Sequence, residues 1–584
     1  MRVSGRRIGR CALLACALAS AACGRVGSEN EPNNANGARG GTQSGGNSGV
    51  GGGVSNGGAT ANAGSGGSSA ASGGTLGLAG PRPSQVRRLS AVEYQATVTD
   101  MLGTTTQVVL NGSDAAEDGF DNVASVSGVS DVLLRSYLEA AETLTNEVFS
   151  TEALRLKIET CTQADDMTCV RNIITQTGLH LFRRPVLEEE IASYQKVYTR
   201  ARARAVTHEG ALKDVLVALL VSAQFVYRME FVPPAAGIQP LTSYEVATRL
   251  SYLLWSSAPD DELLNAAQQN TLQTEPALAA EVTRLLADPK AARFSLNFMG
   301  QWLGTRMVPY VHFNPGTFPE WTPSVGAAAA TEMYAYFAEL LEPDKPFSAL
   351  LDSRAHFVNP ELGALYGLTI QGPVTQRVEL TGVDRRGFLG LVGFLALSAP
   401  PLSRAEPSER GAWILNRLLC SPLPAIPSNM PGYDLSVLGE SGIRGYLEGL
   451  NAQPQCGGCH AQSDPPGLAL ENYDGIGRYR MAYPNGSTID PSVTLSAQLK
   501  LPGDTHVTGI AGLSSALATA PQFTACAAQR LYGYGLGRAF SEEERANVQA
   551  LTARWQGGPM TLRNLMLSLV KSAAFRSRSD GGDL

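Results

Sequence analysis

This chain has few cysteines and histidines, and its net charge is small for its length. Its 584 residues include nine cysteines and six histidines, and the formal net charge is −7 at pH 7. Because acidic and basic residues are interspersed rather than gathered into runs, we expect no nucleic-acid partner. The apolar run near the N-terminus is shorter than a helix needs to cross a bilayer, which disfavours a transmembrane anchor there.

The body of the chain also lacks the signatures of several enzyme classes. It has no βαβ rhythm, no glycine-rich phosphate loop and no G-x-S-x-G nucleophile elbow, which disfavours nucleotide-binding folds and serine hydrolases. The histidines outside the motif discussed below are scattered without the spacing of metal ligands: His180, His208, His312 and His356. The acidic run Asp260-Asp261-Glu262 is more typical of a helix start than of a catalytic carboxylate pair.

The N-terminus indicates export. The stretch MRVSGRRIGR is rich in arginine and has no acidic residue, and CALLACALASAAC follows it. A basic segment, a short apolar core and small residues before Cys23 are typical of a signal peptide, here residues 1–22. Ser20-Ala21-Ala22-Cys23 resembles a lipoprotein cleavage site, at which Cys23 is acylated. Serine occupies the position where leucine is usual, so simple cleavage without acylation is the alternative.

A tether follows the signal peptide. Residues 23–83 are dominated by glycine, serine, asparagine and alanine, with almost nothing to bury, and this composition predicts disorder. Behind an acylated Cys23, such a segment would hold the folded body away from a membrane surface. We therefore expect an exported protein of the bacterial cell envelope, anchored to the outer or inner membrane through its N-terminal lipid and facing the periplasm or the exterior.

The remainder predicts a mainly α fold in which several helical modules follow one another. Ser90 and Glu93 have capping-box spacing at the start of a helix that Gly103 ends. Residues 131–149 have the periodicity of an amphipathic helix. Residues 211–228 are apolar almost all round, which is typical of a buried helix.

Further elements are expected along the rest of the body. A helix capped by Ser243 should run to Trp255, and other helices are expected over residues 326–343 and 410–420. Residues 375–380 favour a short strand.

One motif carries chemistry: Cys456-x-x-Cys459-His460, in the stretch QCGGCHAQSDPPGLALENYDGIGRYR (residues 455–480). In c-type cytochromes two thiols at this spacing bond to the haem vinyl groups, and the adjacent histidine binds the iron. Composition alone would give about 0.001 such matches in a chain of this length. The motif therefore predicts one covalent haem c, attached through Cys456 and Cys459, with His460 as an axial iron ligand.

Other interpretations of the motif stay open. Cys456 and Cys459 could form a structural disulfide or half of a zinc site. Zinc is disfavoured because no second cysteine–histidine pair stands at suitable spacing. A thioredoxin-like redox pair is disfavoured because no βαβ pattern surrounds the motif.

The second axial ligand is open as well. Met481 and His506 lie near the motif in sequence, as does Met430. Histidine would give a low reduction potential and methionine a higher one, and an open position would permit small-molecule chemistry. For His506, an ordinary exposed loop histidine is the favoured interpretation. Arg478 and Arg480 could pair with the haem propionates, or could simply be solvated.

The remaining cysteines predict disulfides. Six are left once the signal peptide and Cys23 are set aside, and an even number permits pairing in an oxidising compartment. Cys161 and Cys169 enclose a short polar loop and are expected to pair. If the CxxCH motif holds haem, Cys420 and Cys526 are left for each other.

These residues resemble the planctomycete cytochrome C-type family, exported multi-module proteins built of several domains of unknown function. The CxxCH stretch carries the resemblance, and other stretches extend it over roughly residues 84–580. Those stretches are RRLSAVEYQATVTDMLG, LFRRPVLEEEIASYQKVY, YEVATRLSYLLWSSAPDDELL, RGAWILNRLLCSPLPAIPSNMPG and FTACAAQRLYGYGLGRAF. Many relatives have an additional N-terminal cytochrome module. The tether stands in its place here, so two haems within one chain are not implied.

The resemblance implies haem c at Cys456, Cys459 and His460, and no established reaction or partner. Combined with the helical periodicity, it divides the body into modules. These are an N-terminal helical module (84–149), a second (150–232), a third (238–370), a cytochrome c-like haem module (375–500) and a C-terminal helical module (508–580).

Electron transfer through the single haem c is the expected function, with an unidentified redox partner. One alternative is a haem-dependent peroxidase or oxygenase that acts on a polymeric or aromatic substrate. Another is a surface binding or scaffold protein without haem, in which Cys456 and Cys459 form a disulfide. Because no catalytic acid, base or distal histidine can be named near the motif, electron transfer is favoured.

Overall fold

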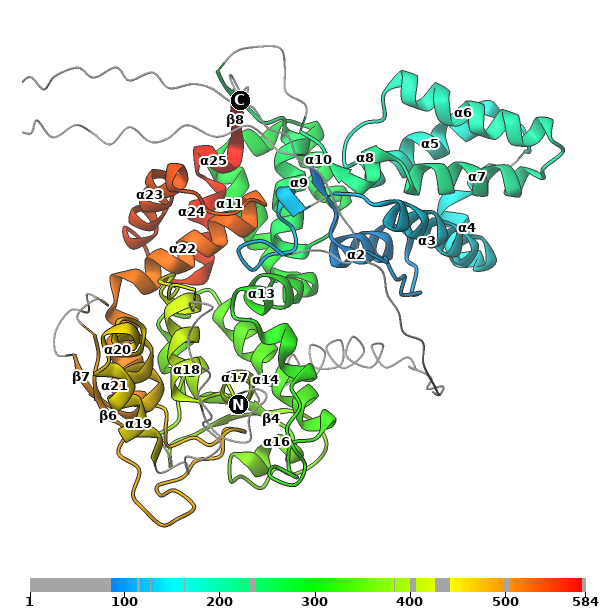
Figure 1. Ribbon diagram of the computed structural model, residues 1–584. Helices are drawn as coiled ribbons and strands as arrows, with labels where there is room; N and C mark the ends of the chain where they lie inside the picture. The colour runs from blue at the N-terminus through cyan, green and yellow to red at the C-terminus, as the bar shows by residue number, and fades with distance from the viewer. Residues whose placement is uncertain are drawn as a thin grey trace, which may run out of the picture.

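The computed structural model describes residues 86–112, 116–126, 128–161, 163–230, 237–382, 384–399, 406–425, 442–496, 499, 501 and 505–579. Within these residues the chain is mainly helical and its strands are short (Figure 1), which confirms the predicted fold class of several helical modules in series. The predicted signal peptide, Cys23 and the tether lie outside the described residues. None of the described helices combines the length and the apolar character that a membrane crossing needs.

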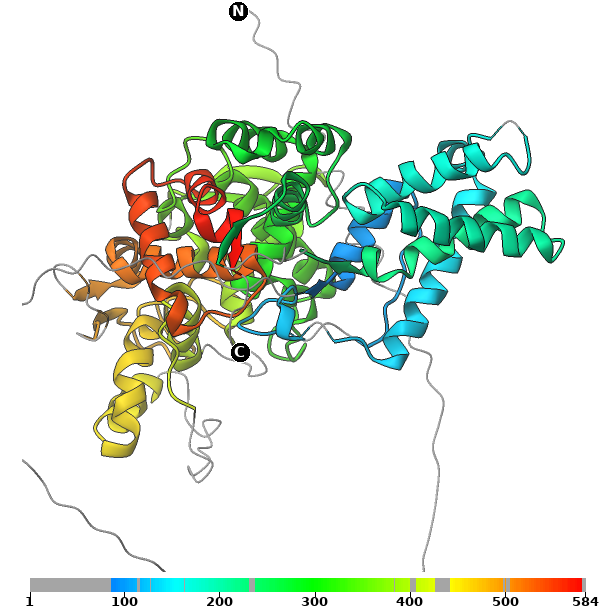
Figure 2. The same ribbon diagram turned by 90° about the horizontal axis from the view of Figure 1, so that it is seen from above.

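The first helices form a lobe with its own hydrophobic core, at the right of Figure 1. Figure 2 shows the same lobe from above, beside the rest of the molecule. Tyr94, Tyr137 and Phe225 are among its buried side chains, and Tyr252 from the next helix along the chain joins them. The helices of the lobe are α2 (Ala91–Leu102), α3 (Asp131–Ser150), α4 (Glu152–Ile158), α5 (Met167–Phe182), α6 (Glu188–Ala203), α7 (His208–Leu220) and α8 (Ala223–Val226).

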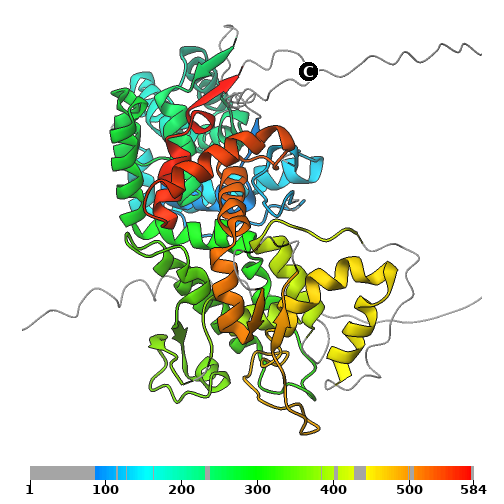
Figure 3. The same cartoon turned by 90° about the vertical axis from the view of Figure 1, so that its left-hand side faces the viewer.

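The remaining helices share a second, larger core. Trp255, Trp302 and Trp555 all belong to it, so segments far apart in sequence are packed into one body. In Figure 3 the orange and red C-terminal helices lie beside the green helices of the middle of the chain. The helices are α9 (Ser243–Trp255), α10 (Asp261–Gln268), α11 (Glu275–Ala287), α12 (Ala292–Phe294), α13 (Gly300–Trp302), α14 (Pro323–Leu340), α15 (Ala349–Asp352), α16 (Pro360–Leu365), α17 (Val392–Leu397), α18 (Pro407–Trp413), α19 (Ile443–Asn451), α20 (Pro454–Leu468), α21 (Gly509–Thr519), α22 (Pro521–Leu536), α23 (Arg545–Gln556), α24 (Leu562–Val570) and α25 (Ala573–Arg576).

Short antiparallel strand pairs join distant parts of the described chain. The pair β1–β2 closes the first lobe and places Arg87 opposite Arg228. The pair β3–β8 fastens the C-terminal end of the body to the segment before α9. The pairs are β1 (Arg87–Arg88) with β2 (Tyr227–Arg228), β3 (Ile238–Pro240) with β8 (Ser577–Ser579), β4 (Ala355–Val358) with β5 (Gln376–Glu379), and β6 (Ser492–Thr494) with β7 (His506–Thr508).

Two predicted helix starts have different outcomes. The capping box of Ser90 and Glu93 is present at the start of α2. The prediction that Ser243 caps α9 is wrong, because Thr242 is the cap. Thr242 accepts from the backbone N–H of Glu245, whose side chain accepts in return from the backbone of Thr242. Two neighbouring hydroxyl residues made the start ambiguous by one position, and the reciprocal bonds decide it.

Two other predicted helices are divided differently. The segment expected as one helix over 211–228 forms α7 and α8, because Ser222 interrupts it and caps α8 by accepting from the backbone N–H of Phe225. The helix expected over 410–420 begins earlier, at Pro407. It continues from α18 into a π-helical segment, η8 (Ile414–Leu418).

Helices α18 and α20 cross at very short range because both have glycine at the contact. A Cβ atom at Gly411 would lie 1.6 Å from the carbonyl oxygen of Ser463, and one at Gly467 would lie 1.7 Å from that of Pro407. A residue with a side chain does not fit at either position unless the backbones separate. The crossing therefore fixes the position of α20, the helix that carries the CxxCH motif.

Gly411→Ala is expected to lower the free energy of unfolding by about 1–3 kcal/mol, because its methyl group must displace the facing backbone. Urea unfolding followed by circular dichroism measures the change. Gly449→Ala in α19 is the matched control, since an added Cβ there meets nothing within 4 Å. The control should be neutral or slightly stabilising. Equal stability of the two variants would contradict the close crossing.

Candidate functional site

Helix α20 carries the whole CxxCH motif. It begins at Pro454, whose missing N–H is tolerated in a first turn. Residues three and four apart share one face of an α-helix, so Cys456, Cys459 and His460 lie on the same side of α20. Both cysteines are free thiols; Cys456 is buried and Cys459 is half-buried. The fold thus brings together the three residues that the sequence singled out.

A carboxylate one turn further along α20 holds His460. The imidazole Nδ1 lies 3.0 Å and 2.9 Å from the two carboxylate oxygens of Asp464. With Nδ1 engaged, Nε2 is the ring nitrogen left for a metal, and a carboxylate partner increases the basicity of such a ligand. This carboxylate was not among the site residues expected from the sequence, although its spacing of four from His460 on a helix is a visible signal.

Asp464 is fixed in turn by hydroxyl groups. Ser408 Oγ, on α18, donates to Asp464 Oδ1 at 2.7 Å, and Ser463 Oγ donates to the same oxygen at 3.2 Å. Burial raises the pKa of the Asp464 carboxyl, while the hydrogen bonds from Ser408 and His460 lower it. The orientation of the imidazole therefore depends on the contact between α18 and α20.

Buried arginines hold the segment that follows α20. Arg410, on α18, is 0% exposed and donates at 2.7–3.1 Å to the backbone carbonyls of Leu470, Tyr473 and Asp474. Burial lowers the pKa of Arg410 to about 10. The guanidinium of Arg385 lies over the ring of Tyr473, 4.6 Å from its centroid. These contacts tie the segment after α20 to α18 and to Arg385.

Arg478 and Arg480 are engaged by carboxylates of this chain. Arg478 pairs with Asp474 at 2.7 Å and with Glu320 at 2.6 Å. Arg480 pairs with Glu471 at 3.0 Å. A haem propionate would have to compete with these carboxylates for either arginine.

Of the candidate second ligands, Met481 and His506 lie on the surface. Met481 is 68% exposed. His506 is exposed on β7, with its Nδ1 3.4 Å from Thr494 Oγ1. Met430 lies outside the described residues. The identity of a second axial ligand stays a prediction.

Two disulfides are present in the structure. One joins Cys161 to Cys169 at the start of α5, and the other joins Cys420 to Cys526. The second bond ties the end of η8 to α22, so the segment that contains α18 is fastened to the C-terminal helices.

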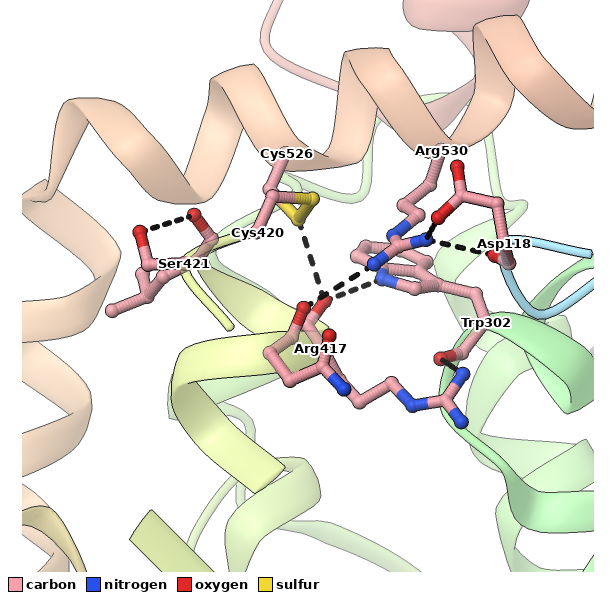
Figure 4. The surroundings of a disulfide bond; sticks show 9 residues. Asp118, Trp302, Arg417, Cys420, Ser421, Cys526 and Arg530 are labelled. Atoms are coloured by element: carbon pink, nitrogen blue, oxygen red, sulfur yellow. Dashed lines mark hydrogen bonds and ion pairs between the residues drawn. A yellow bond between two sulfur atoms is a disulfide. The ribbon is translucent and has the colours of Figure 1, made fainter. Parts of the chain in front are cut away.

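The surroundings of the Cys420–Cys526 bond are polar (Figure 4). The indole N–H of Trp302 donates to the backbone carbonyl of Arg417 at 2.6 Å. Arg530 of α22 pairs with Asp118 at 2.5 Å, which adds a contact between α22 and the loop before α3.

The residues on α20 fit a covalent haem c in their chemistry. Two free thiols three residues apart stand next to an imidazole whose Nδ1 is already bonded. Of the two thiols Cys459 is the more accessible, because Cys456 is only 3% exposed. Across the described residues, α20 included, no group of three or more His, Cys, Asp or Glu side chains is placed so that it could hold a metal ion.

The fold and this site define a helical, multi-module protein with one CxxCH helix in its fourth module. Five family models, each described as a protein of unknown function, match the chain in series: DUF1587 at 87–150, DUF1595 at 169–230, DUF1592 at 241–368, DUF1588 at 385–483 and DUF1585 at 503–575. Together these make up the domain set of the planctomycete cytochrome C family. The DUF1588 match includes the CxxCH motif. No curated protein and no solved structure matches the chain.

Proposed function

We propose that the protein is an envelope-anchored c-type cytochrome-like protein that transfers electrons through one covalent haem c. The observation that carries the proposal is the arrangement on α20, where two free thiols and a carboxylate-bonded imidazole share one face. Cys456 and Cys459 would attach the haem, and Nε2 of His460 would bind its iron. When bound, the group supplies reversible one-electron chemistry. Met481 or His506 is proposed as the second axial ligand.

The N-terminal residues support a location in the cell envelope. A signal peptide, an acylated Cys23 and a glycine-rich tether would place the body on the periplasmic or exterior side of a membrane. The location agrees with the cofactor, because haem c is attached to its protein after export. An unidentified redox partner would meet the protein there.

One observation favours a second candidate function, a haem-dependent peroxidase or oxygenase. Asp464 accepts the Nδ1 hydrogen bond of His460 with both carboxylate oxygens in range. A more basic imidazole stabilises higher oxidation states of a bound iron. An aromatic or polymeric substrate would then have to reach the site.

Haem attachment and iron coordination can be tested on the same protein. In protein made in the periplasm with cytochrome c maturation enzymes, Cys456→Ala/Cys459→Ala should lose the haem that survives denaturing gel electrophoresis. The matched control, Cys161→Ala/Cys169→Ala, removes two cysteines elsewhere and should keep it. Full retention in the first variant would contradict attachment at α20.

In the wild type, electron transfer predicts a low-spin, six-coordinate spectrum that peroxide and carbon monoxide leave unchanged. Reaction of the haem with either molecule would instead favour the peroxidase or oxygenase function.

A further prediction concerns the carboxylate behind His460. Asp464→Asn should raise the midpoint potential on the order of 60 mV, a tenfold change for a one-electron couple, because a neutral amide stabilises the oxidised iron less. A spectroelectrochemical titration measures the shift. Glu448→Gln, an exposed carboxylate change on α19, should leave the potential where it is. The same potential in wild type and Asp464→Asn would rule out an electronic role for the pair.

A further inference from the structure

A cavity of about 310 Å³ lies where the first lobe meets α9. Its wall includes residues of β1, the end of α5, β2 and the start of α9, none of which belongs to the CxxCH module. Five arginines line it: Arg87, Arg183, Arg184, Arg228 and Arg249. We refer to this space, with these five arginines, as the arginine cavity.

Two of these arginines are direct cross-strand neighbours. Arg87 on β1 faces Arg228 on β2, and the two residues are only 5% and 6% exposed. Like charges directly opposite each other destabilise a strand pair. Arg87 Nη1, Arg228 Nε and Arg228 Nη2 are buried without a hydrogen-bond partner. Arg228 Nη2 lies 3.1 Å from a Glu93 carboxylate oxygen, but outside hydrogen-bonding alignment, and its guanidinium stacks on Tyr252.

The other arginines of the cavity are better satisfied. Arg184 pairs with Glu190 through two bonds of 2.7 and 2.9 Å, and Arg249 pairs with Glu230 through two bonds of 2.6 Å. Arg183 donates to the backbone carbonyls of residues 224, 225 and 227. Among the described residues, Arg183 and Arg87 have no carboxylate in an ion pair, so the wall carries an excess of positive charge.

Burying this excess positive charge on the cavity wall is unfavourable in free energy. Glu245, also on the wall, accepts a hydrogen bond of 2.7 Å from Arg578. The guanidinium of Arg87 lies against Gly537 at the C-terminal end of α22, where the helix dipole supplies about half a negative charge. Burial lowers the pKa of Arg87 well below its ordinary value and the charges of Arg228 and Arg249 lower it further, whereas the carboxylates of Glu230 and Glu93 raise it. A buried cation of this kind is normally paired with an anion.

We propose that the arginine cavity binds a small organic carboxylate with an apolar body, whose carboxylate is held by Arg87 and Arg228. A guanidinium fork matches a carboxylate in geometry and charge. Apolar and aromatic side chains make up much of the rest of the wall, including Phe182, Tyr227 and Tyr244. The volume is at the lower end of the range for ligand pockets, which limits the occupant to a small molecule. The binding site goes beyond the proposed electron transfer and uses none of its residues.

Isothermal titration calorimetry of the full-length protein in a chloride-free zwitterionic buffer tests the proposal, with benzoate as the probe. Benzoate should bind at one site, and benzamide, its neutral counterpart, should bind at least tenfold more weakly. Inorganic phosphate should also bind more weakly, because it leaves the apolar wall unused. Equal affinity for benzoate and benzamide, tighter binding of phosphate, or no heat with benzoate at millimolar concentration would each overturn the proposal.

Variants locate the binding. Arg228→Lys and Arg87→Gln should each weaken benzoate binding at least tenfold, whereas Arg171→Gln, an exposed arginine of the same lobe, should not change it. If a variant fails to fold, thermal unfolding of the wild-type protein tests binding instead. Benzoate should raise the midpoint temperature of unfolding, and benzamide should not. Unchanged affinity in both folded cavity variants would contradict the assignment. None of these readouts involves haem, so the outcome is independent of the electron-transfer proposal.

Discussion

The close crossing of α18 and α20 is the constraint on which the candidate site depends. Gly411 and Gly467 let the two backbones touch, and this contact brings Ser408 of α18 to the carboxylate of Asp464. Asp464 then holds the imidazole of His460 from the side opposite to Nε2. The spacing of the CxxCH motif places the three haem residues on one face, but packing between helices decides how the ligand is oriented.

The sequence predicted well those features that depend on the local spacing of residues. The mainly α fold and the capping box of Ser90 and Glu93 both follow from periodicities of three or four residues. The boundary between α7 and α8 was missed because Ser222 interrupts an apolar stretch that looks continuous. Asp464 was missed although it stands four residues after His460, because no helix was expected over the motif. Its contact with Ser408, 56 residues earlier in the chain, has no signal in the sequence.

The family domains do not coincide one by one with the hydrophobic cores of the structure. The family domains follow one another in sequence, yet the described residues form two hydrophobic cores. The larger core includes Trp255 and Trp302 of the DUF1592 domain together with Trp555 of the DUF1585 domain. The CxxCH helix belongs to this shared body, whereas the arginine cavity lies at its junction with the first lobe. The long helical part before the CxxCH module therefore has a candidate binding role of its own, in addition to its role in packing.

The most direct test of the central claim is an alkaline pyridine haemochrome spectrum of protein produced in the periplasm with cytochrome c maturation enzymes. A haem bonded to both Cys456 and Cys459 should give an α-band at the position typical of two thioether links, with one haem per chain. Absence of a haem band under these conditions would contradict it and leave Cys456 and Cys459 as ordinary cysteines of a helical envelope protein.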